Sequence, residues 1–145
     1  MMNVRMLSNL ECTKLVAENR LGHLECAKNG QPYVVCFTYA HADNHLYAFS
    51  MPGKKIDWMR ANPLVCAQID EHRQGREWRS VIVDGRYEEL LDPVGRDHAW
   101  SLLSKHFDWW EPGGLKPVTS EISDHSPHVF FRISIEQMSG REARE

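Results

Sequence analysis

The segment with the clearest chemical potential is residues 49–56, which read FSMPGKKI. A hydroxyl (Ser50), a glycine-containing turn and two cations (Lys54 and Lys55) stand where a strand should end and a helix begin. Unpaired N–H groups and the positive end of the helix dipole favour an anion such as phosphate there. Two interpretations stay open: a phosphate-binding corner, or a solvated turn with two surface lysines. The spacing is not that of a P-loop, so nucleotide hydrolysis is not implied.

Histidines form two groups that suggest a metal site. His41, Asp43 and His45 lie around one loop, and His125 and His128 lie in another. A site of two histidines and a carboxylate needs these side chains to converge. Neither group has the i, i+4 spacing that a helix would provide, so we interpret them as surface-loop residues and predict no metal.

Catalytic groups of the familiar kinds cannot be identified. There is no Ser-His-Asp order, no pair of acidic residues and no reactive cysteine beside a base. His23 is predicted next to Cys36, where its imidazole could donate a proton near a ligand; a buried, hydrogen-bonded histidine is the alternative. The chain has four cysteines without a C-x-x-C pair, which argues against zinc binding and thiol–disulfide exchange. We interpret them as buried free thiols.

Aromatic side chains are numerous for a chain of 145 residues, with five Trp, four Tyr and five Phe. Trp78 is expected to begin a strand, and Trp109 and Trp110 follow a predicted helix. Such residues can stack on a flat ligand, or they can pack in a dimer interface, where Trp is enriched. Both interpretations hold if a ligand lies at the interface.

Two strands joined by a tight turn are predicted over residues 22–27 and 32–40. Asn29-Gly30 supplies the two positive-φ residues of the turn, which fixes the register. The expected opposing pairs are Lys28 with Gln31, Cys26 with Tyr33, Leu24 with Val35 and His23 with Cys36. Residues 33–39 are apolar on both sides, so a ligand or another subunit is expected to cover the second face.

The remaining elements follow from caps, turns and alternation. A capping box, Ser8 with Glu11, predicts a helix to Asn19. Asp92-Pro93 opens another helix, expected to run through Phe107. The other elements are a strand over 45–50, a helix over 54–62, strands over 64–70 and 78–90 with a bend or bulge at 84–85, an extended loop over 108–127, a strand over 128–138 and a loose polar tail over 139–145. We therefore expect a mainly β fold, an antiparallel sheet of about six strands closing into a small barrel flanked by helices.

Composition limits the classes of function. Hydrophobic residues make up 42% and charged residues 26% of the chain, values typical of a globular protein, and its length suits a single domain over 1–145. The net charge of -3 supplies no general attraction to nucleic acid or to anionic membranes. No apolar run resembles a signal peptide or a membrane span, so a cytoplasmic location is expected.

In order and spacing, several segments resemble the pyridoxamine 5'-phosphate oxidase-like flavoproteins with the FMN-binding split barrel, and more closely the branch containing the nitroimidazole resistance proteins. The matching segments are LGHL at 21–24, QPYVVCFTY at 31–39, HLYAFS at 45–50, GKKI at 53–56, NPLVC at 62–66, WRSVIVDGR at 78–86, FRI at 131–133 and SGRE at 139–142.

This resemblance implies a six-stranded antiparallel split barrel and a homodimer with FMN in a groove between the subunits. Lys55, with Ser50 and Lys54, would hold the phosphate. The isoalloxazine ring would be lined by Val35, Cys36, Phe37 and Thr38, with Trp78 and Ser80 approaching from a later strand. Relatives commonly carry proline in place of Cys36, so this chain gains a backbone N–H beside the ring.

The resemblance implies an FMN-dependent oxidoreductase acting on a small organic substrate, such as a nitro compound, with a nicotinamide or other reductant supplying electrons. A second hypothesis is a non-catalytic module that binds FMN, haem or a deazaflavin. A third is an empty barrel that acts as a dimeric interaction protein. Substrate-phosphate residues of pyridoxamine phosphate oxidases cannot be placed in the sequence, so a role in vitamin metabolism is not inferred.

Overall fold

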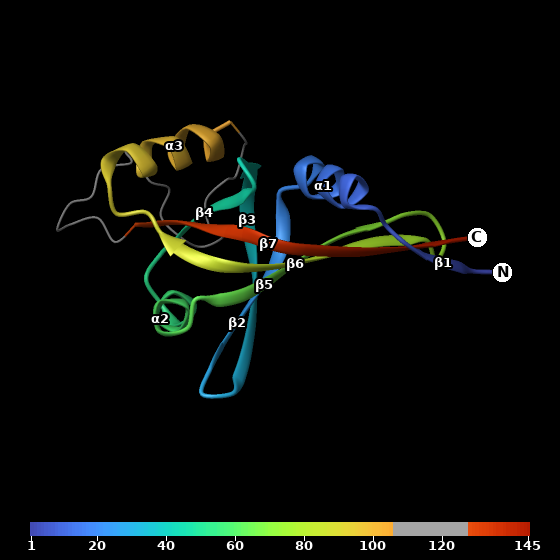
Figure 1. Ribbon diagram of the computed structural model, residues 1–145, viewed down its shortest axis with the longest axis horizontal. Helices are drawn as coiled ribbons and strands as arrows, with labels where there is room; N and C mark the ends of the chain where they lie inside the picture. The colour runs from blue at the N-terminus through green and yellow to red at the C-terminus, as the bar shows by residue number, and fades with distance from the viewer. Residues whose placement is uncertain (106–127) are drawn as a thin grey trace.

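The computed structural model describes residues 1–105 and 128–145 and consists mainly of β-strands, with three helices in the described part (Figure 1). In chain order the elements are β1 (Asn3–Met6), α1 (Asn9–Glu18), β2 (Leu21–Lys28), β3 (Gln31–Ala42), β4 (His45–Ser50), α2 (Lys54–Ala61), β5 (Leu64–His72), β6 (Trp78–Glu89), α3 (Pro93–Leu103) and β7 (Val129–Arg144).

All the strand pairs in the sheet are antiparallel, in the order β1-β7-β4-β3-β2-β5-β6. A further pairing of β6 with β7 closes the six strands from β2 to β7 into a ring. This confirms the predicted mainly β, six-stranded antiparallel split barrel. β1, which the sequence did not predict, is a seventh strand and pairs with the C-terminal end of β7.

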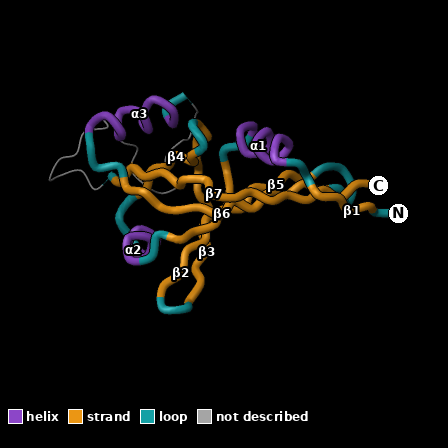
Figure 2. Tube along the Cα trace, in the orientation of Figure 1, coloured by secondary structure: helices purple, strands orange, loops and turns teal. Residues whose placement is uncertain are grey.

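The predicted β2–β3 hairpin is confirmed in register. Lys28 pairs with Gln31 and His23 with Cys36. Asn29 and Gly30 have φ values of 51° and 80°, as a two-residue turn with two positive-φ positions requires. The hairpin projects from the rest of the sheet (Figure 2), and α2 packs against its β2 strand.

Local signals place the other elements near their predicted bounds. Ser8 and Glu11 form the capping box at the start of α1, and the Asp92 side chain accepts the Gly95 N–H at the start of α3. The β6–β7 register shifts between Asp84 and Gly85, which confirms the predicted irregularity. A Cβ on Gly85 would lie 2.3 Å from the Ser134 carbonyl oxygen, so only glycine fits the close approach of these two backbones.

Two buried clusters form the core in the described part of the chain. The larger one lies within the barrel and includes Leu24, Phe37 and Tyr39, and the smaller one lies beneath α3 and includes Tyr47 and Phe130. The Tyr39 hydroxyl donates a 2.8 Å hydrogen bond to the Val16 carbonyl, so α1 is fixed to β3 through a fully buried tyrosine.

Two predictions need correction, and a further group cannot be compared with the structure. The tail over 139–145, expected to be loose, forms most of the C-terminal half of β7, where Gly140, Glu142 and Ala143 are buried. Cys36 is exposed and Cys66 is half-buried, so only Cys12 and Cys26 are the buried thiols expected of all four. The predicted end of the last helix at Phe107, the loop over 108–127, and Trp109 and Trp110 lie outside the described residues.

Candidate functional site

Residues from three elements enclose a small pocket where β3 and β4 separate. It has a volume of about 130 Å³ and is lined by Tyr33, Val35, Ser50, Met51, Pro52, Gly53, Lys54 and Lys55. The structure thus brings together four of the predicted site residues: Val35, Ser50, Lys54 and Lys55. Ser50 is fully buried, and Lys55 is only 8% exposed.

The start of α2 gives this pocket a positive character. β4 ends at Ser50, and Gly53, in extended backbone at φ 168°, is the N-cap of α2 without any side chain to cap the helix. The first backbone hydrogen bond of the helix runs from the Asp57 N–H to the Gly53 carbonyl at 3.0 Å. The N–H groups of the first turn therefore lack a side-chain cap beside two lysines, an arrangement that favours an anion.

The two lysines have different surroundings. Lys55 is buried in the pocket wall, whereas Lys54 is exposed and its ammonium lies 4.4 Å from the Tyr33 ring centroid and 4.6 Å from that of Trp58. Their combined positive charge acts on Cys26: burial and Glu25 raise the pKa of this thiol, and both lysines act in the opposite direction. Lys54 and Lys55 thus form one local positive field.

One edge of β3 is open beside this pocket. Within the described residues β4 pairs with β3 only over Tyr39–Ala42, so Gln31–Thr38 has β2 as its one described neighbour. The Tyr39 N–H donates to the Arg20 carbonyl on the β2 side at 2.8 Å. Because bonded and non-bonded residues alternate along an antiparallel pair, Val34, Cys36 and Thr38 direct their N–H and C=O groups toward the open edge.

Side chains of the predicted ring-lining residues point in different directions. Phe37 is buried in the core, 5.5 Å from Tyr39 between ring centroids, and its backbone N–H and C=O face β2, so neither its side chain nor its backbone polar groups face the open edge. Cys36 is exposed on the outer face, and Thr38 is half-buried. The exposed fraction of Val34, 58%, means that the described residues leave the outer face of this apolar strand uncovered.

Trp78 and Ser80 lie elsewhere in the same chain. They line a separate hollow of about 220 Å³ that includes Met6 and Arg141. Trp78 pairs with Ala143 near the chain termini, well apart from the α2 end of the molecule where Lys55 lies (Figure 1). One chain therefore does not bring these two residues to the Lys55 pocket.

A row of polar side chains crosses the outer face of the sheet. The Gln68 amide donates a 3.0 Å hydrogen bond to the Ser80 hydroxyl, and its oxygen lies 3.2 Å from His23 Nδ1. The amide oxygen can accept from a protonated Nδ1. His23 is exposed, so the buried-histidine interpretation is wrong.

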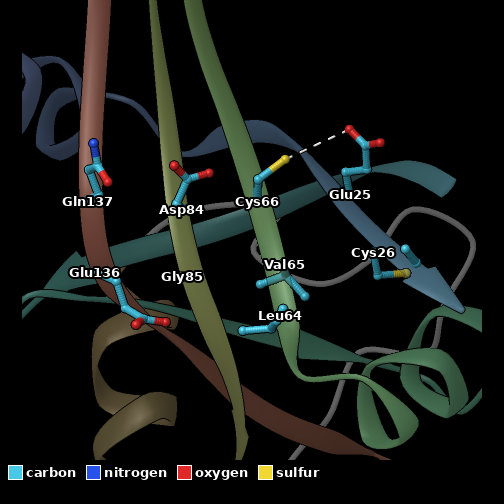
Figure 3. A pocket seen from close by; sticks show the side chains of 10 residues that line it. Glu25, Cys26, Leu64, Val65, Cys66, Asp84, Gly85, Glu136 and Gln137 are labelled. Atoms are coloured by element: carbon cyan, nitrogen blue, oxygen red, sulfur yellow. Dashed lines mark hydrogen bonds between the residues drawn. The ribbon is translucent and has the colours of Figure 1, made fainter. Parts of the chain in front are cut away.

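A wider hollow of about 600 Å³ lies on the outer face of β2, β5, β6 and β7 (Figure 3). Its polar lining includes three carboxylates, those of Glu25, Asp84 and Glu136. The Cys66 thiol donates to Glu25 over 3.8 Å, and burial, followed by the negative charge of Glu25, raises the pKa of this thiol. These carboxylates would repel a phosphate, so the larger volume of this hollow does not make it the better candidate for an anion site.

No three His, Cys, Asp or Glu side chains converge as a metal site in residues 1–105 and 128–145. His45 Nδ1 lies 2.6 Å from the Asp43 carbonyl oxygen, and the Asp43 carboxylate lies 3.2 Å from His98. Burial lowers the pKa of His41 despite the opposing effect of Asp43. His125 lies outside the described residues.

The sequence analysis missed Tyr33, which lines the pocket, and Trp58, which packs against Tyr33 beside it. Trp58 stands four positions after Lys54, and this i, i+4 spacing on a helix could have indicated their contact. Tyr33 comes from the hairpin, and its approach to α2 depends on the fold.

The fold and the pocket define an antiparallel split barrel with a positively charged corner. The family model of pyridoxamine 5'-phosphate oxidase matches residues 8–142, and the chain belongs to this family. No helix of the described part has the length and apolar character that a membrane span requires.

Similar proteins cover nearly the whole chain. An uncharacterised protein of Rhizobium meliloti (strain 1021) is 54% identical over 98% of this chain and 97% of its own length. The crystal structure of a FAD-binding protein from Mesorhizobium loti is 63% identical, covers all of both chains and superposes with a TM-score of 0.81. A proposed 5-nitroimidazole antibiotic resistance protein from Bacteroides thetaiotaomicron is 19% identical, covers 100% of this chain and 93% of its own, and has a TM-score of 0.76, a likeness of fold.

Proposed function

We propose that this protein binds a flavin nucleotide and acts as an oxidoreductase on a small organic substrate. The observation that carries the proposal is the pocket with Ser50 and Lys55, positive and beside the open edge of β3. The FAD-binding description of the Mesorhizobium loti protein supports it, because that protein is 63% identical over its whole length. FMN, implied by the family resemblance, and FAD share the riboflavin phosphate half, so both would use this corner.

The phosphate fits this corner in chemistry and in size. A buried lysine and the uncapped start of α2 provide donors and positive charge; the buried Ser50 hydroxyl donates to the Met51 carbonyl at 2.8 Å and would turn from it to donate to the phosphate. The 130 Å³ pocket is smaller than the roughly 300 to 1,000 Å³ of typical ligand sites. The ring system would therefore lie outside it, along the open edge of β3.

That edge offers hydrogen-bonding groups that suit the polar end of a flavin ring. The backbone groups of Val34, Cys36 and Thr38 alternate donors and acceptors there, and the flavin pyrimidine edge carries both kinds. Cys36 contributes an N–H that proline, common in relatives, would lack. Phe37 would support this strand from the core side and would not contact the ring with its side chain.

The flavin, when bound, supplies the ability to accept and return a hydride or single electrons. The chain's own residues bind and orient it: Lys55 and Ser50 fix the phosphate, and the β3 backbone sets the plane of the ring. We assign no proton-transferring side chain. A nicotinamide or other reductant would deliver electrons, and an organic acceptor such as a nitro compound would receive them.

The site would be completed by a second copy of the chain. Trp78 and Ser80 cannot reach the Lys55 pocket within one chain, so their proposed approach to the ring requires the partner subunit of a homodimer. The exposed apolar residues on the outer face support such an interface: Val34 is 58%, Leu64 56% and Ile82 37% exposed.

The test is to identify the bound cofactor. Purified protein should show a flavin absorption spectrum, and mass spectrometry of the released cofactor should give the mass of FMN or FAD. Addition of a nicotinamide and a nitroaromatic acceptor should then produce oxidised nicotinamide at a rate that depends on the flavin. Protein that binds neither flavin on titration would refute the proposal, and a Soret band would indicate haem. Flavin binding without turnover for any acceptor would favour the non-catalytic module.

A further inference from the structure

An aromatic pair stands beside the proposed phosphate corner and contacts Lys54, the exposed one of its two lysines. The Tyr33 and Trp58 ring centroids are 5.7 Å apart, with planes inclined at 56°. The Lys54 ammonium contacts both rings, at 4.4 Å and 4.6 Å from their centroids. Tyr33 and Lys54 line the pocket and Trp58 stands beside them; both rings are half-buried, and Lys54 is exposed.

This arrangement suits a flat, electron-rich ring that carries a negative group. The base of a nucleotide stacks on tryptophan or tyrosine whatever its hydrogen-bonding pattern. A cationic ligand is disfavoured, because Lys54 and Lys55 already make the area positive. Lys54 has a flexible four-carbon stem, so its ammonium can leave the rings for a nearby phosphate and expose the ring faces.

We propose that Tyr33, Trp58 and Lys54 form a subsite for the adenosine monophosphate half of FAD. The inference rests on the proposed flavin function and adds the choice of nucleotide. Ser50 and Lys55 hold the phosphate next to riboflavin, Lys54 moves to the second phosphate, and an aromatic ring stacks on the adenine. FMN lacks both the second phosphate and the adenine, so it gains nothing from this subsite. The chain therefore binds FAD more tightly than FMN.

Titration calorimetry of the flavin-free protein with FAD and with FMN tests this subsite. The ratio of the two dissociation constants is compared among wild type, Trp58→Leu, Tyr33→Leu and the flat-ring controls Trp58→Phe and Tyr33→Phe. Any loss of folded protein reduces the binding-competent fraction for both ligands equally, so it leaves the ratio unchanged. We expect wild type to prefer FAD by about tenfold or more.

At least one leucine variant should lose most of the preference for FAD, while its affinity for FMN stays near that of wild type. The phenylalanine variants should retain the preference for FAD. ADP should compete with FAD in wild type, and less so in that leucine variant. Equal affinity of wild type for the two flavins, or a preference that survives both leucine substitutions, would overturn the subsite and leave the proposed flavin function intact. Failure of both flavins to bind would overturn the two together.

Discussion

Arg5 Nε lies 2.8 Å from Glu142 Oε2, an ion pair that joins the first strand of the chain to the last. On the other side Arg79 Nε lies 3.4 Å from Glu142 Oε1, so the same carboxylate also connects β6. Glu142 is only 3% exposed. A buried carboxylate is stable when such partners compensate for its lost hydration.

Substitution Glu142→Gln should lower the free energy of unfolding by about 2 kcal/mol, because Arg5 and Arg79 lose their buried carboxylate partner and retain only the more exposed Glu11. Urea denaturation followed by circular dichroism measures this change. Glu145→Gln is the matched control, since Glu145 and its partner Arg76 are both largely exposed and such pairs contribute about 0 to 1 kcal/mol. Equal effects of the two substitutions would contradict a structural role for the buried pair.

Acid should destabilise the start of α1 through Glu11. Hydrogen bonds from Arg5 and from the Ser8 N–H lower the pKa of Glu11 from 4.5 to about 2. A carboxyl group whose pKa is lower in the folded than in the unfolded protein stabilises the fold at pH values above the unfolded-state pKa. This stabilisation is lost as the pH falls from 4.5 toward 2.

Glu11→Gln keeps a residue that suits the capping box but removes the charge. Its Tm should therefore lie below that of wild type at pH 6, and the gap should narrow as the pH falls toward 2. Glu18→Gln, at an exposed position 4.0 Å from Lys14, serves as the control and should show little change. A gap for Glu11→Gln that is constant with pH would be inconsistent with the lowered pKa.

Gly85→Ala should lower the free energy of unfolding by about 2 kcal/mol, since the added methyl would overlap the Ser134 carbonyl and the Ile133 side chain. Gly53→Ala is the comparison, because no atom lies within 4 Å of its Cβ position and its backbone is extended. Both variants are compared by urea denaturation. Tolerance of alanine at position 85 would mean that the two strands are not so close in solution.

Lys55→Met should weaken flavin binding about ten- to a hundredfold, because it removes the buried phosphate cation and retains most of the apolar stem. FMN titration of the flavin-free protein measures the loss. Lys28→Met, on the exposed end of the β2–β3 hairpin, should bind FMN as wild type does. Unchanged affinity in Lys55→Met would remove Lys55 from the site.

Val34→Arg should convert the proposed homodimer to a monomer, since it places a charge in the exposed apolar face of β3. Val94→Arg introduces the same change on α3 at a position that is 78% exposed and should leave the dimer intact. Analytical ultracentrifugation of wild type and both variants measures whether each is a monomer or a dimer. A monomeric wild type, or a Val34→Arg variant that remains dimeric, would place the interface elsewhere or remove it.

Short-range patterns predicted most of the fold. Asn29-Gly30 was sufficient for the hairpin register, and Gly85 marked the bulge, because each reflects a local backbone requirement. The polar segment at 139–145 could not be predicted as a strand. The buried carboxylate of this segment, Glu142, forms ion pairs with Arg5 and Arg79, which are distant in sequence.

The candidate site was predictable in part for the same reason. Ser50, Lys54 and Lys55 are close in sequence, and the turn between strand and helix keeps them together in space. Trp78 and Ser80 were predicted near the same ligand, but in a single chain they lie in another hollow. Tyr33 approaches Trp58 only when the hairpin lies against α2, which no local pattern encodes.

The open edge of β3 has a consequence for the flavin-free chain. An unpaired strand edge is a template onto which another extended segment can add, and this is a common route to aggregation. Pro32 protects only the start of this edge, because it lacks an N–H. In our proposal the cofactor occupies the rest of this edge, so the ligand that provides the chemistry also shields this stretch of backbone from strand addition. Loss of the cofactor would then cost the protein solubility as well as activity.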